Sequence, residues 1–110
     1  MKNDIKFWSF LEIKGLNATA EEIAEVHTNR RCIAECAEVI SGFRYGETLL
    51  SKDDPSLVTV VCGWTDKSAY EEWQNHPVRN KQLADLSGEL KVESSEHTFD
   101  SFYRLNPQDK

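Results

Sequence analysis

The stretch FRYGETLLSKDDPSLVTVVCGW, residues 43–64, decides the fold of this chain. Residues 57–64 are rich in β-branched residues and apolar on both faces, which is typical of a central strand. Residues 43–51 predict a second strand, and the Asp and Pro residues of segment 52–56 favour a reverse turn between the two. The stretch therefore predicts a β-hairpin.

One strand and one helix are expected before this hairpin. Residues 5–14 alternate between an apolar face and a face that carries Trp8 and Phe10, as a β-strand does. Segment Thr19–Glu22 matches a capping box, which predicts the start of a helix. Apolar residues then recur at helical spacing until Gly42, so we expect one helix of about five to six turns.

A second helical region and a final strand follow the hairpin. Asp66 is a candidate N-cap, and segment 75–77, Asn-His-Pro, predicts a break before the helix resumes at residues 78–86. Residues 97–105 alternate again and predict the last strand. Residues 106–110 are expected to form a frayed tail.

The predicted element order is β-α-β-β-α-β, which indicates an α+β, ferredoxin-like fold. Such a fold has an antiparallel sheet with its helices on one face. We expect one domain over residues 1–110, with a core over residues 5–105. Because Trp8 and Phe10 lie on the opposite face of the first strand, we expect a second copy to cover it in a homodimer.

Composition excludes several classes of protein. The chain has 110 residues and a net charge of −6, which argues against a nucleic-acid partner. No segment approaches the roughly 20 apolar residues of a membrane span, and residues 1–14 lack the features of a signal peptide. Cys32, Cys36 and Cys62 show no CxxC spacing, so we expect free thiols in the cytoplasm.

Several motifs together resemble the antibiotic biosynthesis monooxygenase family of the dimeric α/β-barrel superfamily. These motifs appear in the family's order and spacing over roughly residues 5–105. They are Ser41–Glu47 after the first helix, Ser51–Pro55 in the hairpin turn, Trp64 at the end of a strand, and Ser68–Tyr70 with Trp73 in the next helix.

The resemblance implies a homodimer with a pocket between sheet and helices in each subunit. Its members include oxygenases that need no metal or flavin and act on electron-rich phenols or quinols, and a branch that binds and degrades heme. Two positions depart from these patterns. Val60 stands where the polyketide-type oxygenases have Asn, and Leu83 stands where the heme-degrading branch has its iron-ligating His.

Aromatic residues are the first candidates for the site. The resemblance implies that Trp64, Tyr70 and Trp73 line the pocket, the indoles as a slot for a flat ligand and the phenol as an orienting group. The alternative for both indoles is plain core packing, and for Tyr70 a structural hydrogen bond.

Candidate proton acceptors and cations come next. His76 or His27 is placed as a base for a phenol, since an imidazole titrates near neutral pH; the alternative for each is a surface position. Arg30 interrupts an apolar stripe, and it or Arg44 could stabilise an oxyanion in the pocket, although Arg30 could also reach solvent. No metal site is expected.

The sequence thus predicts a monooxygenase of a small aromatic, quinol or polyketide-like substrate, acting with O2 and without a cofactor. Two alternatives stay open. One is a heme-binding or heme-degrading protein, with heme as the cofactor. The other is a dimeric small-molecule-binding module without catalysis.

Overall fold

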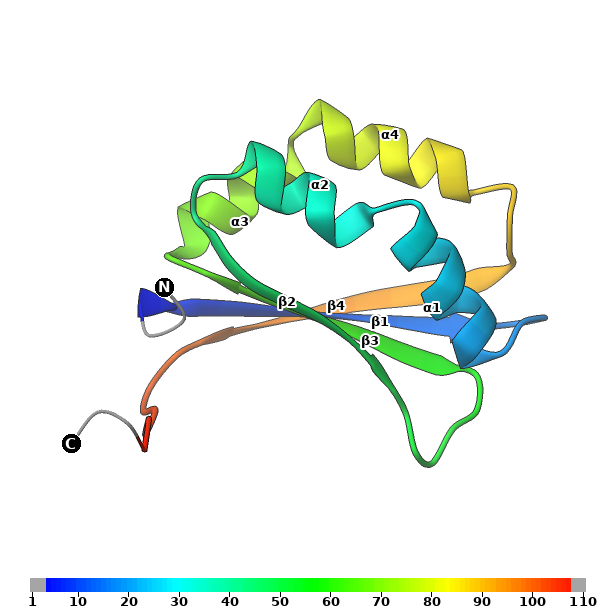
Figure 1. The fold of residues 1–110 in the computed structure, drawn as a ribbon, viewed down its shortest axis with the longest axis horizontal. Helices are drawn as coiled ribbons and strands as arrows, with labels where there is room; N and C mark the ends of the chain where they lie inside the picture. The colour runs from blue at the N-terminus through cyan, green and yellow to red at the C-terminus, as the bar shows by residue number, and fades with distance from the viewer. Residues whose placement is uncertain (1–3, 108–110) are drawn as a thin grey trace.

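The computed structural model describes residues 4–107. Its elements are β1 (Phe7–Gly15), α1 (Ala20–Asn29), α2 (Cys32–Val39), β2 (Phe43–Leu50), β3 (Leu57–Trp64), α3 (Lys67–Gln74), α4 (Pro77–Leu86) and β4 (Val92–Asp100). The strands form one antiparallel sheet in the order β2-β3-β1-β4. The helices cover one face of this sheet (Figure 1), which confirms the predicted ferredoxin-like α+β fold. None of the described helices is long and apolar enough to cross a membrane.

The two central strands follow the sequence prediction closely. The strand β3 has the bounds expected for it, and it pairs with β2 as the predicted hairpin. In β1, the helix-facing residues Phe7, Ser9 and Ile13 are all buried. Residues of this face and of β3 form the core against the helices, because alternate strand residues point to the same side.

The helix after β1 is not the single helix that the sequence predicts. Its start is as expected, because Thr19 and Glu22 form a complete capping box. The expectation of one continuous helix is wrong, since α1 ends at Asn29 and α2 begins at Cys32. Arg31 has a φ of 63°, in the left-handed region, and that conformation cannot continue a right-handed helix.

The predicted break in the second helical region is confirmed. The Asp66 carboxylate accepts a hydrogen bond from the Ala69 N–H at 3.0 Å and so begins α3. His76 caps α4, and Pro77 occupies its first turn. The chain therefore turns between two short helices, as residues 75–77 indicate.

The last strand begins and ends earlier than expected. Instead of residues 97–105, β4 covers Val92–Asp100 and pairs with β1 from Phe7 to Gly15. Residues 101–107, here called the C-terminal arm, leave the sheet on the side away from the helices (Figure 1). Of the expected frayed tail, residues 108–110 lie outside the described residues.

Candidate active site

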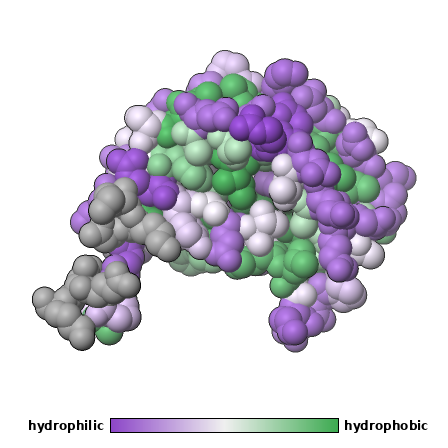
Figure 2. Space-filling model, in the orientation of Figure 1, coloured by the Kyte–Doolittle hydropathy of each residue, from purple (hydrophilic) through white to green (hydrophobic). Residues whose placement is uncertain are grey.

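A cavity of about 670 Å³ lies between the sheet and the helix layer. This volume is within the range of ordinary small-molecule sites. Figure 2 shows apolar side chains reaching the surface between the two layers. Most of the lining residues are apolar, and the largest group among them is aliphatic, including Leu11, Ile23, Ile33, Val60, Leu86 and Leu90. The expected pocket is therefore present in the fold.

Trp64 is at once a core residue and a wall of this cavity. Its side chain is buried, and it meets the rings of Phe43 and Tyr70 edge-on at centroid distances of 5.5 and 5.7 Å. The indole Nε1 donates a hydrogen bond to Ser9 Oγ at 3.0 Å, across the strand pair. The packing and pocket interpretations of Trp64 are thus compatible.

Replacing Ser9 by alanine is expected to leave the buried indole N–H without its partner. An unsatisfied buried donor costs about 1–3 kcal/mol of folding free energy. Urea unfolding of Ser9→Ala should therefore show a loss of this size. The matched control is Ser94→Ala, at an exposed position of the same edge strand, which should stay near the unmodified protein. Equal stability of the two variants would show that the indole N–H finds another acceptor.

Trp73 supplies a second aromatic wall. It is half-buried on α3, lines the cavity, and stacks on His76 with ring centroids 6.2 Å apart. Trp64 and Trp73 therefore border the same cavity from a strand and from a helix. This arrangement suits a flat ligand.

His76 lies outside the cavity. Its Nδ1 accepts a hydrogen bond from the Val78 N–H at 3.1 Å, which makes the imidazole the cap of α4. It is not among the residues that line the cavity. The structure therefore gives His76 a role in the turn before Pro77 and does not bring it to the site where a base is needed.

His27 is the imidazole that the structure brings to the cavity. It projects from α1 and lines the wall next to Val26 and Cys32. Its Nδ1 is buried and has no hydrogen-bond partner among the described residues. Burial lowers the His27 pKa below its ordinary value, because the charged form is poorly solvated there. Because the neutral ring lines the cavity, it is the imidazole placed to accept a proton from a bound ligand.

The two predicted arginines are committed elsewhere. Arg30 bonds through Nη1 to Glu35 at 2.8 Å and through Nη2 to Asp85 at 2.9 Å, so it ties the α1–α2 break to α4. Arg44 pairs with Asp4 at 3.2 Å and donates to the Ser41 carbonyl. Neither lines the cavity. Arg30 can therefore interrupt the apolar stripe because two nearby carboxylates pair with its guanidinium.

A guanidinium does reach the cavity, from a residue that the sequence did not single out. Arg79 on α4 and Glu96 on β4 both line the wall, with Arg79 Nη2 3.9 Å from Glu96 Oε1. Tyr70 is buried beside them and does not itself line the cavity. Burial and the Glu96 carboxylate raise the Tyr70 pKa, so its phenol stays protonated.

The two positions that depart from the family's patterns also face the cavity. Val60 is buried in the sheet wall, and Leu83 lies in the α4 wall. Both are apolar, so the cavity has no amide at the first position and no imidazole at the second. This chain therefore departs from the two family patterns at residues that line its cavity.

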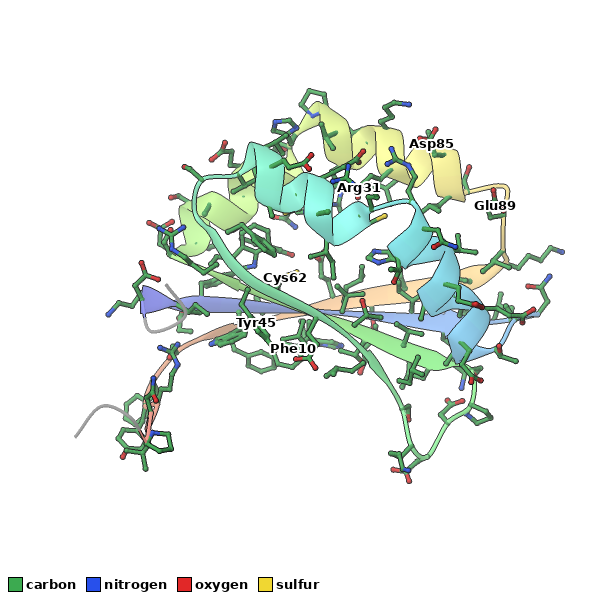
Figure 3. All side chains as sticks on the ribbon, in the orientation of Figure 1. Phe10, Arg31, Tyr45, Cys62, Asp85 and Glu89 are labelled. Carbon is green, nitrogen blue, oxygen red and sulfur yellow. The ribbon has the colours of Figure 1, made fainter. Side chains whose placement is uncertain are left out.

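All three cysteines line the cavity as free thiols. Burial raises the pKa of Cys32 to about 11 and that of Cys62 to about 12. Cys62 points from β3 toward the helices (Figure 3). At neutral pH these thiols behave as small apolar groups. Within residues 4–107, no cluster of three or more His, Cys, Asp or Glu residues is placed to hold a metal ion.

Solved structures of known proteins share this fold. The cofactor-independent oxygenase SnoaB from Streptomyces nogalater is 20% identical, over 91% of this chain and 97% of its own, with a TM-score of 0.70. A monooxygenase from the gene ActVA-Orf6 of Streptomyces coelicolor, solved with nanaomycin D, is 15% identical over 96% and 95%, with a TM-score of 0.71. Protein SO0527 from Shewanella oneidensis is 20% identical over 90% and 93%, with a TM-score of 0.69.

The resemblance to antibiotic biosynthesis monooxygenases is thus confirmed at the level of the fold, over nearly the whole chain. No protein-family profile matches the chain, and no curated protein matches it in sequence. At these identities the shared fold leaves the reaction to be argued from the site's own residues.

Proposed function

We propose that this protein is a monooxygenase of the antibiotic biosynthesis type, which oxidises an electron-rich aromatic, quinol or polyketide-like substrate with O2 and without a cofactor. The observation that carries the proposal is an apolar cavity that is walled by Trp64 and Trp73 and lined by the imidazole of His27. The fold shared with SnoaB and the ActVA-Orf6 enzyme supports the same reaction class.

The chemistry starts with proton transfer from a phenolic hydroxyl to His27. The phenolate then gives one electron to O2, and the resulting radical pair combines at the para carbon to form a peroxide. Loss of water, with departure of the proton on that carbon, leaves a quinone. One oxygen atom of O2 enters the product and the other leaves as water, so a phenol plus O2 gives a quinone plus H2O.

The cavity's own groups favour this route. Proton transfer to the neutral imidazole of His27 places a positive charge beside the phenolate, and the two opposite charges stabilise each other in the apolar enclosure. Flat indole walls hold the ring, and the neutral thiols add no charge. Three free cysteines also favour a reducing compartment, so we retain the cytoplasm as the proposed location.

The test is oxygen uptake with a simple phenol of suitable size. With 1-naphthol under ¹⁸O2, the protein should consume O2 and form 1,4-naphthoquinone that carries one ¹⁸O atom. Heat-denatured protein gives the background. Ligand-dependent thermal stabilisation without any O2 uptake across a panel of naphthols and anthrones would overturn catalysis and support the non-catalytic binding module.

Heme is the alternative cofactor. Leu83 stands at the position of the iron-ligating His of the heme-degrading branch, and a leucine side chain cannot bind iron. This difference supports a cofactor-independent reaction. A hemin titration is expected to leave the Soret band of free hemin unshifted. A shifted band that disappears in His27→Phe would contradict this and would point to heme bound through that imidazole.

A homodimer through the sheet completes the proposal. The face away from the helices, here called the back face, carries a groove lined by Trp8, Phe10, Glu12, His97 and Phe99. Phe10 and Tyr45 lie on this side of the sheet (Figure 3). The adjoining C-terminal arm has Phe102, Tyr103 and Leu105 exposed by 102, 77 and 70%. A second copy, with the same face turned inward, would bury these apolar groups.

The back-face interface makes a prediction about mass in solution. Phe99→Asp places a carboxylate in the proposed interface and is expected to convert the dimer to monomer, because an unpaired buried charge opposes association. Sedimentation equilibrium measures the change. The control is Asn80→Asp, which adds the same charge on an exposed residue of α4 and should remain dimeric. A Phe99→Asp protein with the mass of the unmodified protein would place the interface elsewhere.

A further inference from the structure

Arg79 differs from Arg30, Arg31 and Arg44 in its partners. Arg30, Arg31 and Arg44 each donate to a carboxylate, at 2.8, 2.6 and 3.2 Å. The Arg79 guanidinium makes no hydrogen bond within residues 4–107, and its one charged partner, Glu96, is 3.9 Å away. Yet its side chain is only 27% exposed and forms part of the cavity wall.

Glu96 is held from its other side. Gln74 donates to the Tyr70 hydroxyl at 3.0 Å, and the phenol in turn faces the Glu96 carboxylate. The Glu96 carboxylate therefore lies near the Tyr70 phenol as well as 3.9 Å from Arg79. The guanidinium has five N–H groups and no close acceptor.

We propose that Arg79 is a carboxylate-binding residue of the cavity, and that the natural ligand is a flat aromatic compound carrying a carboxylate. The proposal rests on the proposed function only in sharing its cavity. A guanidinium binds a carboxylate through two parallel N–H···O bonds, and a partly enclosed wall strengthens them. The aromatic part of such a ligand would lie between Trp64 and Trp73, which line the same cavity.

An anionic ligand fits these groups better than a cationic one. A cation bound at Glu96 would lie beside the Arg79 guanidinium and would be repelled by it. An anion can take hydrogen bonds from the Arg79 guanidinium, which makes none within residues 4–107 and whose ion pair with Glu96 is long, at 3.9 Å.

The test compares two ligands that differ in charge and match in shape: 2-naphthoate, ionised at pH 7.5, and 2-naphthamide, which is neutral. Calorimetry on the intact protein should show the carboxylate binding more tightly by about tenfold or more, as expected for charge-assisted hydrogen bonds. In Arg79→Gln this preference should vanish. In Glu96→Gln it should grow several-fold, since the competing carboxylate is gone.

Arg31→Gln is the matched control, because it removes one positive charge from an exposed arginine that pairs with Glu38 outside the cavity. It should keep the preference of the unmodified protein. Equal affinity for the two ligands in the unmodified protein, or a tenfold preference that survives in Arg79→Gln, overturns the assignment. If 2-naphthamide binds and only the preference for the carboxylate is missing, the role of Arg79 is wrong and the proposed function stands. If neither ligand binds, the role of Arg79 and the proposed function both fail.

Discussion

Replacing Trp64 by alanine is expected to lower the free energy of unfolding by about 3–5 kcal/mol, the usual cost of truncating a buried indole. The side chain is 1% exposed and contacts Phe43 and Tyr70, so the space it leaves cannot be filled by small movements. The total free energy of unfolding of a domain of this size is about 5–15 kcal/mol. Urea unfolding followed by circular dichroism should show a transition at much lower denaturant.

Trp73→Ala is the comparison that separates packing from ligand binding. Trp73 is half-buried and stacks on His76, so its loss should cost clearly less stability. It should still weaken binding of an aromatic ligand, because the same ring lines the cavity. A Trp64→Ala protein as stable as Trp73→Ala would show that the indole of Trp64 is not part of the core.

The elements with strong local signals were predictable from the sequence. A run of β-branched residues predicts Leu57–Trp64 to the residue, and the caps Thr19 and Asp66 mark the starts of α1 and α3. These signals are local because they depend on strand propensity and on hydrogen bonds within one turn. The fold class followed from their order.

The helix break at Arg31 was not predictable because no Gly or Pro marks it. The residue before it, Arg30, pairs with Asp85, which lies 55 positions further along the chain. The same distant partner explains why an arginine interrupts an apolar stripe. Contacts between remote segments leave no trace in a pattern read over one helix.

Glu96 and Arg79 were missed for a related reason. The helix-facing residues of β4 after Val92 are polar, among them Ser94 and Glu96, so alternation of apolar residues does not reveal the strand. Because β4 is an edge strand, its residues remain exposed and need not be apolar. That Glu96 meets an arginine from α4 depends on the packing of the helix layer.

The choice of base in the proposed reaction can be decided between His27 and His76. His27→Gln keeps a polar side chain of similar length that cannot take a proton. It is expected to lower kcat for naphthol oxidation by about 10²–10⁴-fold, the usual contribution of a general base. His76→Asn keeps an acceptor that can cap α4, and it should retain activity within a few-fold.

The pH dependence gives a second, independent readout of His27. Because burial lowers its pKa, the imidazole stays neutral to a lower pH than a free histidine, whose pKa is about 6.5. The acid limb of kcat/KM should therefore lie below pH 6.5. Below that pH the unfolded chain binds a proton at His27 more readily than the folded one, so stability falls as the pH drops from 6.5 toward the lowered pKa.

His27→Phe should remove this part of the pH dependence of unfolding, because no group remains at that position to titrate. The control is His76→Asn, since His76 caps α4 and does not line the cavity. Stability that falls equally between pH 6.5 and 5 in the unmodified protein and in His27→Phe would show that His27 is not a buried neutral imidazole. Full activity in His27→Gln would remove it as the base. The carboxylates of Glu89 and Glu96 would then be the remaining candidate bases among the residues that line the cavity.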